Sequence, residues 1–173
     1  MSRLITLFSA PKPFTNPHID LIQRNAIQSW IHLGDEVEVF LVGEEAGLAE
    51  VAREYGIPQL AAVKRNDQGT PLVSSIFELA REASQAPLLA YVNGDILLLP
   101  DFVQAARSLI TQYDRFLAIS QRWDLEVKTP LDFSLGWERR LAAEVSHRGR
   151  LHPPAGSDIF LFPRTEFGKI PDF

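Results

Sequence analysis

Asn93 and Asp95 are the residues whose type and spacing point most directly to chemistry. They lie two residues apart in LLAYVNGDILLLPDF, residues 88–102, within the most apolar run of the chain. Side chains two residues apart on a strand project to the same face, so both can meet one ligand. Gly94 between them would let that ligand approach the backbone closely. This pattern fits a metal and phosphate site at the end of a buried strand.

A β-hairpin is the alternative structure for the same residues. Asn-Gly between two strand-like runs is a strong signal for a tight turn. However, residues 88–92 and 96–99 are apolar on both faces, whereas a hairpin with one solvated face alternates apolar and polar residues. The pattern alone leaves both interpretations open.

Strand-like and helix-like segments alternate along the chain. Asn16 is the expected N-cap of a helix with Pro17 in its first position, and Thr70 and Pro71 are expected to play the same roles for a later helix. The predicted strands are residues 4–8, 36–43, 60–65, 87–95 and 157–164, and the predicted helices are residues 17–33, 44–56, 71–83, 100–114 and 135–145.

This alternation predicts an α/β fold, a three-layer α/β/α sandwich with a mostly parallel, Rossmann-like sheet. In such sheets ligands bind outside the carboxyl ends of the strands. Three loops follow strand-like runs and are therefore candidates for binding: residues 11–14, 66–70 and 93–95.

Composition narrows the class of protein. The 173 residues are 46% hydrophobic and 23% charged, which suits one globular domain, and a net charge of -5 gives no long-range attraction for nucleic acid. The chain contains no cysteine, which excludes disulfides, thiolate zinc sites and a cysteine nucleophile. No run reaches the roughly 20 apolar residues of a membrane span, and we expect a cytoplasmic protein without a transmembrane segment.

The segment YVNGDILLLPDF resembles the Asp-x-Asp element of GT-A glycosyltransferases, the nucleotide-diphospho-sugar transferase superfamily, in an Asn-x-Asp form. Four other segments resemble the same superfamily in the same order, so that the resemblance covers nearly the whole chain: LFSAPKPF, AIQSWIHLGDEVEVFLVG, NDQGTPLVSSIFELAREAS and GSDIFLFPR. The resemblance implies a GT-A-like fold.

The resemblance also implies an activity and its residues. A sugar would move from a nucleotide-diphospho-sugar donor to an unknown acceptor, while Mn²⁺ or Mg²⁺ neutralises the leaving diphosphate. Asp95 would be the metal ligand, Asn93 a contact to ribose or sugar, and Asp158 a catalytic or acceptor-binding acid. The further candidates for donor binding are Pro11, Lys12, Asn66, Gly69 and Thr70.

Each of these candidates also has a structural interpretation. Lys12 fits an exposed loop lysine, residues 66–70 fit a turn with a helix cap, and Asp158 fits the exposed end of a strand. His152 fits either a third metal ligand or a solvated loop residue. Trp123 is expected in the core rather than against a sugar.

Two other functions share this fold. One is a non-catalytic module that binds nucleotide-sugars, and the other is a nucleotidyltransferase, whose glycine-rich phosphate loop is missing because SAPKPF contains no glycine. Residues 1–173 are expected to form a single GT-A-like domain that lacks C-terminal segments of the superfamily. Such a domain would transfer sugar slowly unless a homo-oligomer or a longer chain completes its site.

Overall fold

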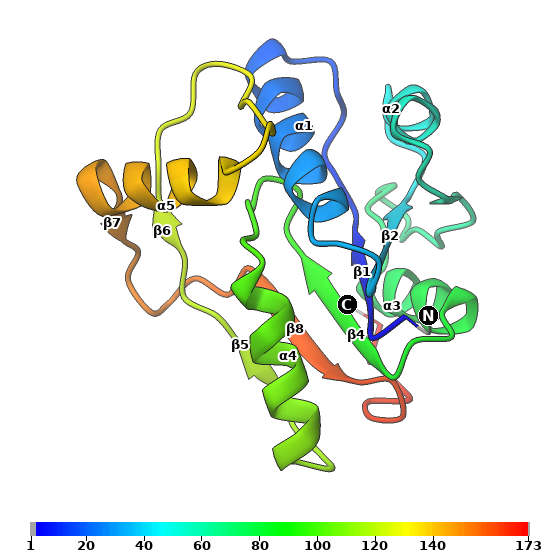
Figure 1. The fold of residues 1–173 in the computed structure, drawn as a ribbon. Helices are drawn as coiled ribbons and strands as arrows, with labels where there is room; N and C mark the ends of the chain where they lie inside the picture. Colours follow the sequence, from blue (N-terminus) through cyan, green and yellow to red (C-terminus); the bar gives the residue numbers. More distant parts are fainter. Residues whose placement is uncertain (1–2, 173) are drawn as a thin grey trace.

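A six-stranded sheet forms the centre of the computed structural model, which describes residues 3–172 (Figure 1). Its strand order is β3-β2-β1-β4-β8-β5. The first four strands along the chain run parallel, and β8 pairs antiparallel with both β4 and β5. The strands of this sheet are β1 (Ile5–Ser9), β2 (Val37–Val42), β3 (Gln59–Leu60), β4 (Leu88–Val92), β5 (Ala118–Ile119) and β8 (Ile159–Pro163).

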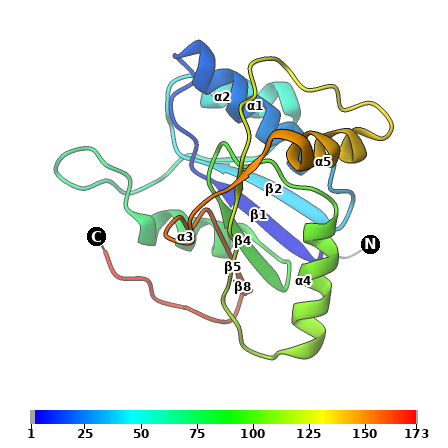
Figure 2. The same cartoon turned by 90° about the vertical axis from the view of Figure 1, so that its left-hand side faces the viewer.

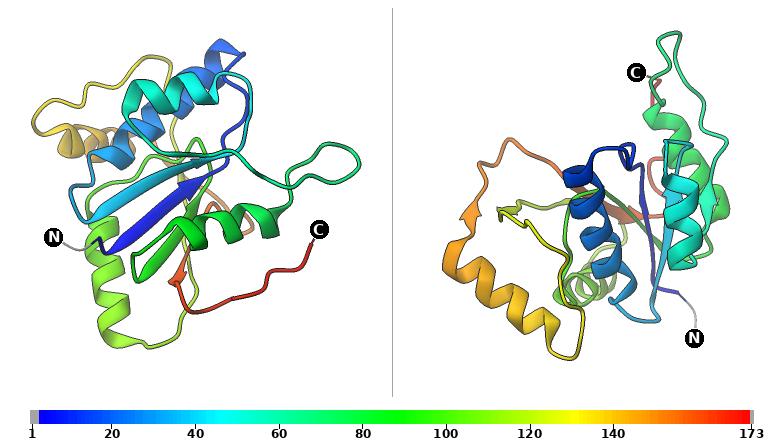
Figure 3. Two further views of the ribbon diagram at one scale, coloured as in Figure 1. Left: turned by 90° about the vertical axis from the view of Figure 1, so that its right-hand side faces the viewer. Right: turned by 90° about the horizontal axis from the view of Figure 1, so that it is seen from above.

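Helices cover both faces of this sheet, which confirms the predicted layered α/β fold. Apolar side chains of α1, α2 and α4 pack on one face, and those of α3 pack on the other. Figure 3 shows α3 and the C-terminal segment on this second side. The helices are α1 (Pro17–Ile31), α2 (Leu48–Tyr55), α3 (Val73–Ala83), α4 (Asp101–Gln112) and α5 (Trp137–Arg148). Within residues 3–172, no helix has the length and apolar character needed to cross a membrane.

Helix α1 begins where its local sequence predicts. The Asn16 side chain accepts hydrogen bonds from the backbone N–H groups of His18 and Ile19, at 2.9 and 3.1 Å, and Pro17 opens the helix. These bonds satisfy donors that have no partner within a helix. The helix then buries Trp30 fully, so one face of α1 is fixed against the sheet.

Strand β4 ends at Val92, and the hairpin interpretation is wrong. The strand lies between β1 and β8, with Leu88 and Leu89 fully buried on its two faces. The Ile96 N–H donates to the Asn93 carbonyl and closes a turn over Gly94 and Asp95. Residues 96–99, the second strand of the expected hairpin, form no strand. The apolar character of both faces thus reflects a central strand covered on each side.

The expected cap at Thr70 is also wrong. Helix α3 begins at Val73 with Leu72 as its N-cap residue. The Thr70 N–H donates instead to the Asn66 side chain at 3.0 Å, within a loop that the same side chain closes through Gln68. A competing side chain upstream therefore draws Thr70 into a turn.

Strand β3 is shorter than predicted, because only Gln59 and Leu60 pair with β2. A separate two-stranded sheet joins β6 (Trp123–Asp124) and β7 (Arg150–Leu151) away from the central sheet. Trp123 lies in this small sheet with 52% of its surface exposed, so the expectation that it is a core residue is wrong.

Candidate functional site

A cleft of 920 Å³ lies at the carboxyl ends of β1 and β4. Residues of α1, the turn after β4, the start of α4 and the beginning of β8 contribute to its lining. Another wall is formed by residues 120–127, which we call the crossing segment. Figure 2 shows this chain leaving β5 and running along the side of the molecule that carries α4 and α5. The cleft therefore lies at the edge of the sheet where ligands of open α/β folds bind.

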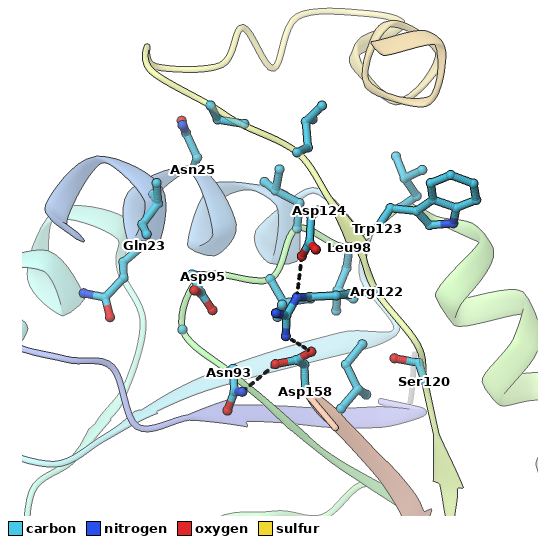
Figure 4. A pocket seen from close by; sticks show the side chains of 18 of the residues that line it. Gln23, Asn25, Asn93, Asp95, Leu98, Ser120, Arg122, Trp123, Asp124 and Asp158 are labelled. Carbon is cyan, nitrogen blue, oxygen red and sulfur yellow. Dashed lines mark hydrogen bonds and ion pairs between the residues drawn. The ribbon is translucent and has the colours of Figure 1, made fainter. Parts of the chain in front are cut away.

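Asp158 lies at the centre of the polar side chains in this cleft (Figure 4). The Asn93 side-chain amide donates to one of its carboxylate oxygens at 2.8 Å, and Arg122 Nη1 donates to the other at 2.6 Å. The backbone N–H of Asn93 also donates to the Asp158 carbonyl at 2.9 Å. Asp158 is only 6% exposed, so its interpretation as an exposed strand end is wrong.

Arg122 connects Asp158 to the small sheet. Its Nε donates to Asp124 at 2.8 Å, and its Nη2 lies 3.1 Å from the Nδ1 atom of His152. Hydrogen bonds to Asp124 and then to Asp158 raise the pKa of Arg122, and hydrogen bonds from Arg122 and then from His152 lower the pKa of Asp124. His152 is thus engaged with Asp124 and Arg122 rather than exposed to solvent alone. Neither Arg122 nor Asp124 could be singled out from the sequence, because the contacts that join them to Asp158 and His152 span 28 to 36 residues.

Asp95 differs from Asp158 in having no protein partner. It lies exposed in the turn after β4 and lines the cleft, and its carboxylate makes no hydrogen bond or ion pair with any of residues 3–172. No group of three acidic, histidine or cysteine side chains in that range could hold a metal ion. Mg²⁺ commonly binds through one or two carboxylates together with substrate phosphates. The donor set therefore fits a cation shared with a diphosphate, and it does not fit one held by protein groups alone.

Gln23 of α1 fixes the loop that follows β1. Its side chain accepts from the Lys12 N–H at 2.7 Å and donates to the Lys12 carbonyl at 2.9 Å. The same side-chain oxygen would lie 2.9 Å from a Cβ atom at Gly94, and the Pro11 Cα would lie 3.3 Å away. A side chain at position 94 would therefore meet Gln23 and Pro11, whereas Gly94 itself lines the cleft, and close approach of a ligand to its backbone stays a prediction. Gln23 was not among the residues that could be singled out from the sequence.

The predicted donor-binding residues divide into two groups. Lys12 and Asn93 line the cleft together with Asp95 and Asp158, and Pro11 packs beside it against Gly94. The remaining candidates do not line the cleft: Asn66, Gly69 and Thr70. Their loop is held by Arg65, which donates to the Gly69 carbonyl and to Glu45, each at 2.8 Å. Their role in binding a donor stays a prediction.

Tyr91 provides a test of the electrostatics at this edge. Burial, and then the negative charge of Asp95, raise the pKa of its phenol. The neutral phenol therefore stabilises the fold below the usual tyrosine pKa of about 10, and this contribution is lost as the pH rises through the raised value. We expect the stability of wild type relative to Tyr91→Phe to stay constant up to about pH 9 and to fall as the pH rises through about 10 and above, as measured by urea denaturation.

The control for this experiment is Tyr113→Phe, which alters an exposed tyrosine outside the cleft. This variant shows how much of the pH dependence comes from removing an exposed phenol, and the Tyr91→Phe series is compared with it. A constant difference between wild type and Tyr91→Phe would contradict the assigned environment of Tyr91.

Several known protein structures share this fold. The chain matches no protein-family model and no curated protein sequence. Glucosyl-3-phosphoglycerate synthase from Mycobacterium tuberculosis matches its structure with a TM-score of 0.55 at 17% identity, over 94% of this chain and 57% of that one. A 4-diphosphocytidyl-2C-methyl-D-erythritol synthase from Anaerococcus prevotii matches with a TM-score of 0.52 at 11% identity, over 94% and 72% of the two chains.

A third structure, residues 1–349 of TarS from S. aureus, matches with a TM-score of 0.49 at 11% identity, over 66% of this chain and 34% of that one. The chain thus spans about a third of residues 1–349 of TarS and somewhat more than half of the glucosyl-3-phosphoglycerate synthase chain. At such identities the likeness concerns the fold. The protein has the GT-A-like α/β fold that its sequence segments resemble.

Proposed function

We propose that this chain is a glycosyltransferase domain that binds a nucleotide-diphospho-sugar and a divalent cation in the cleft at the ends of β1 and β4. The main support is the contrast between two carboxylates of this cleft. Asp158 is neutralised by Arg122 and held by Asn93, whereas Asp95 is exposed and without a protein partner. A carboxylate of the second kind is suited to an external cation.

The charge of the cleft supports the need for such a cation. Its lining contains five carboxylates but only one lysine and one arginine, and Arg122 is already paired with Asp124 and Asp158. A diphosphate would be repelled by this surface unless a cation accompanied it. Mg²⁺ or Mn²⁺ at Asp95, with the diphosphate as a further ligand, would supply the charge that stabilises the leaving group.

The chain's own residues have separable roles in this proposal. Lys12 supplies a charge on the loop after β1. The Asn93 amide N–H₂ is directed to Asp158, which leaves its oxygen free to accept a hydrogen bond from a ribose or sugar hydroxyl. Asp158 is the candidate base for the acceptor hydroxyl, but both of its oxygens are engaged. It would act as a base after Arg122 turns away from it.

The loop after β1 favours this function over nucleotidyl transfer. Pro11 and Pro13 have no N–H, the Lys12 N–H donates to Gln23, and the Phe14 N–H donates to the Ala46 carbonyl at 2.8 Å. Residues 11–14 therefore present no unbonded backbone N–H to a triphosphate. Phosphate-binding loops depend on such groups.

Calorimetric titration tests the proposal. Wild type is titrated with UDP-glucose, GDP-glucose and dTDP-glucose in Mn²⁺, in Mg²⁺ and in EDTA, with CTP as the comparison ligand. We expect saturable binding of at least one nucleotide-sugar, weakened about tenfold or more in EDTA. Tighter binding of CTP than of every nucleotide-sugar would favour a nucleotidyltransferase, and binding without release of sugar in a turnover assay would favour the non-catalytic module.

A further inference from the structure

Apolar side chains from several elements line the same cleft beyond the polar residues at the strand ends. They come from α1, the turn before α4, α4 itself, the crossing segment and α5. All of them are half-buried and border the open space of the cleft, and Phe102 also packs against the core: Ile22, Leu99, Phe102, Leu125, Val127 and Val145. We call this part of the cleft the apolar chamber.

Hydrogen bonds fix the positions of the segments that form the walls of the apolar chamber. The Trp30 indole N–H donates to the Ile96 carbonyl at 2.8 Å, and the Leu98 N–H donates to Ser29 at 3.0 Å, which fixes the turn after β4 against α1. The Asn25 side chain bonds the backbone of Thr129 and Leu131, at 3.1 and 2.9 Å, beyond the crossing segment. A chamber fixed in this way is preorganised for an apolar ligand.

The charges near the apolar chamber exclude anionic ligands. Asp101 precedes Phe102, and Glu126 lies between Leu125 and Val127, and both acids line the cleft. Arg122, the cation of the crossing segment, is occupied by Asp124 and Asp158, and Lys128, directly after that segment, pairs with Glu126 at 3.0 Å. A phosphate or carboxylate in the chamber would therefore face the Asp101 carboxylate, while the cations on the crossing side are already paired.

We propose that the apolar chamber binds the acceptor, and that this acceptor is an uncharged, hydroxyl-bearing molecule with an apolar body. That this molecule is an acceptor rests on the proposed function, whereas its binding in the apolar chamber does not. The chamber is continuous with the polar part of the cleft, so an apolar body bound there would place a hydroxyl group towards Asp158. Its recognition depends on apolar contact and on the absence of negative charge.

Binding of simple probes tests this inference. Octyl β-D-glucoside, below its micelle concentration, presents an uncharged head and an apolar tail, octyl sulfate presents an anionic head, and glucose lacks the tail. We expect saturable one-to-one binding of octyl β-D-glucoside, about tenfold or more tighter than that of either other probe. Binding of octyl sulfate at equal strength would overturn the charge argument, and binding of glucose at equal strength would overturn the apolar one.

Two matched alanines locate the binding. Ala105 is exposed on α4 and lines the cleft, whereas Ala143 is exposed on α5 outside the lining. Ala105→Trp should fill part of the chamber and weaken octyl β-D-glucoside about tenfold or more, and Ala143→Trp should bind like wild type. Ala105→Arg should strengthen octyl sulfate binding, while Ala143→Arg should not. Equal behaviour of the two positions would refute the chamber as the site.

The probes contain no nucleotide, so this inference and the proposed function fail separately. Binding of octyl β-D-glucoside by a protein that binds no nucleotide-sugar would retain the chamber and refute the glycosyltransferase. Binding of a nucleotide-sugar by a protein that binds none of the octyl probes would refute the chamber alone.

Discussion

We expect replacement of Asp95 by Ala to abolish metal-dependent nucleotide-sugar binding and to leave the protein folded. The carboxylate is exposed and bonds to no other described residue, so its removal takes no hydrogen bond from the core. If the cation is shared between Asp95 and the diphosphate, the variant retains no protein carboxylate for it at the end of β4. We expect binding in Mn²⁺ to fall to the level of wild type in EDTA, with a free energy of unfolding within about 0.5 kcal/mol of that of wild type.

Asp114→Ala is the control for this prediction. Asp114 is also an exposed loop carboxylate with the same charge, but it follows α4 and does not line the cleft. Calorimetry on both variants separates loss of a ligand from loss of one negative charge in the chain. Metal-dependent binding by Asp95→Ala at wild-type strength would remove the central support of the proposed function.

Replacing Asp158 by Asn lowers sugar transfer by about 10²–10⁴-fold if Asp158 is the base. The change keeps the shape of the side chain but removes the charge that pairs with Arg122 at 2.6 Å. Because hydrogen bonds to charged groups contribute about 1.5–3 kcal/mol, we also expect a measurable loss of stability. Turnover is measured at a temperature where both proteins are fully folded, so that this loss does not enter the rate.

Arg122→Gln separates the role of a base from the role of holding the crossing segment. It removes the same ion pair but leaves the Asp158 carboxylate and its bond from Asn93 in place. If Asp158 is the base, Arg122→Gln should retain clearly more sugar transfer than Asp158→Asn. Equal losses in the two variants would mean that Asp158 only positions Arg122, and turnover unaffected by Asp158→Asn would exclude both roles.

The parts of the fold that could be predicted depend on neighbours in sequence. Asn16 and Pro17 begin α1 through bonds that span two and three residues, and the apolar faces of β4 reveal a central strand. The turn that closes at Asn93 follows directly, so the position of Asn93 and Asp95 at a strand end could be inferred. These signals are local, and the structure of the folded protein agrees with them.

The rest of the site depends on contacts that one sequence does not reveal. Asn93 meets Asp158 across 65 residues, and Arg122 meets Asp158 across 36. Neither distance leaves a periodic signal, so the burial of Asp158 and the function of Arg122 could not be read from the pattern. The error at Thr70 has a different cause, because the nearby Asn66 side chain accepts from the Thr70 N–H and holds Thr70 in a turn ahead of the helix.

The contact between Asn25 and the segment after β6 has a consequence for the order in which the molecule assembles. Its two hydrogen bonds join residues 104 and 106 positions apart, to Thr129 and Leu131. Contacts of such sequence separation form late, because a long loop must first close. During synthesis α1 would emerge long before its Asn25 amide finds these partners, so one wall of the cleft is completed only after most of the chain has folded.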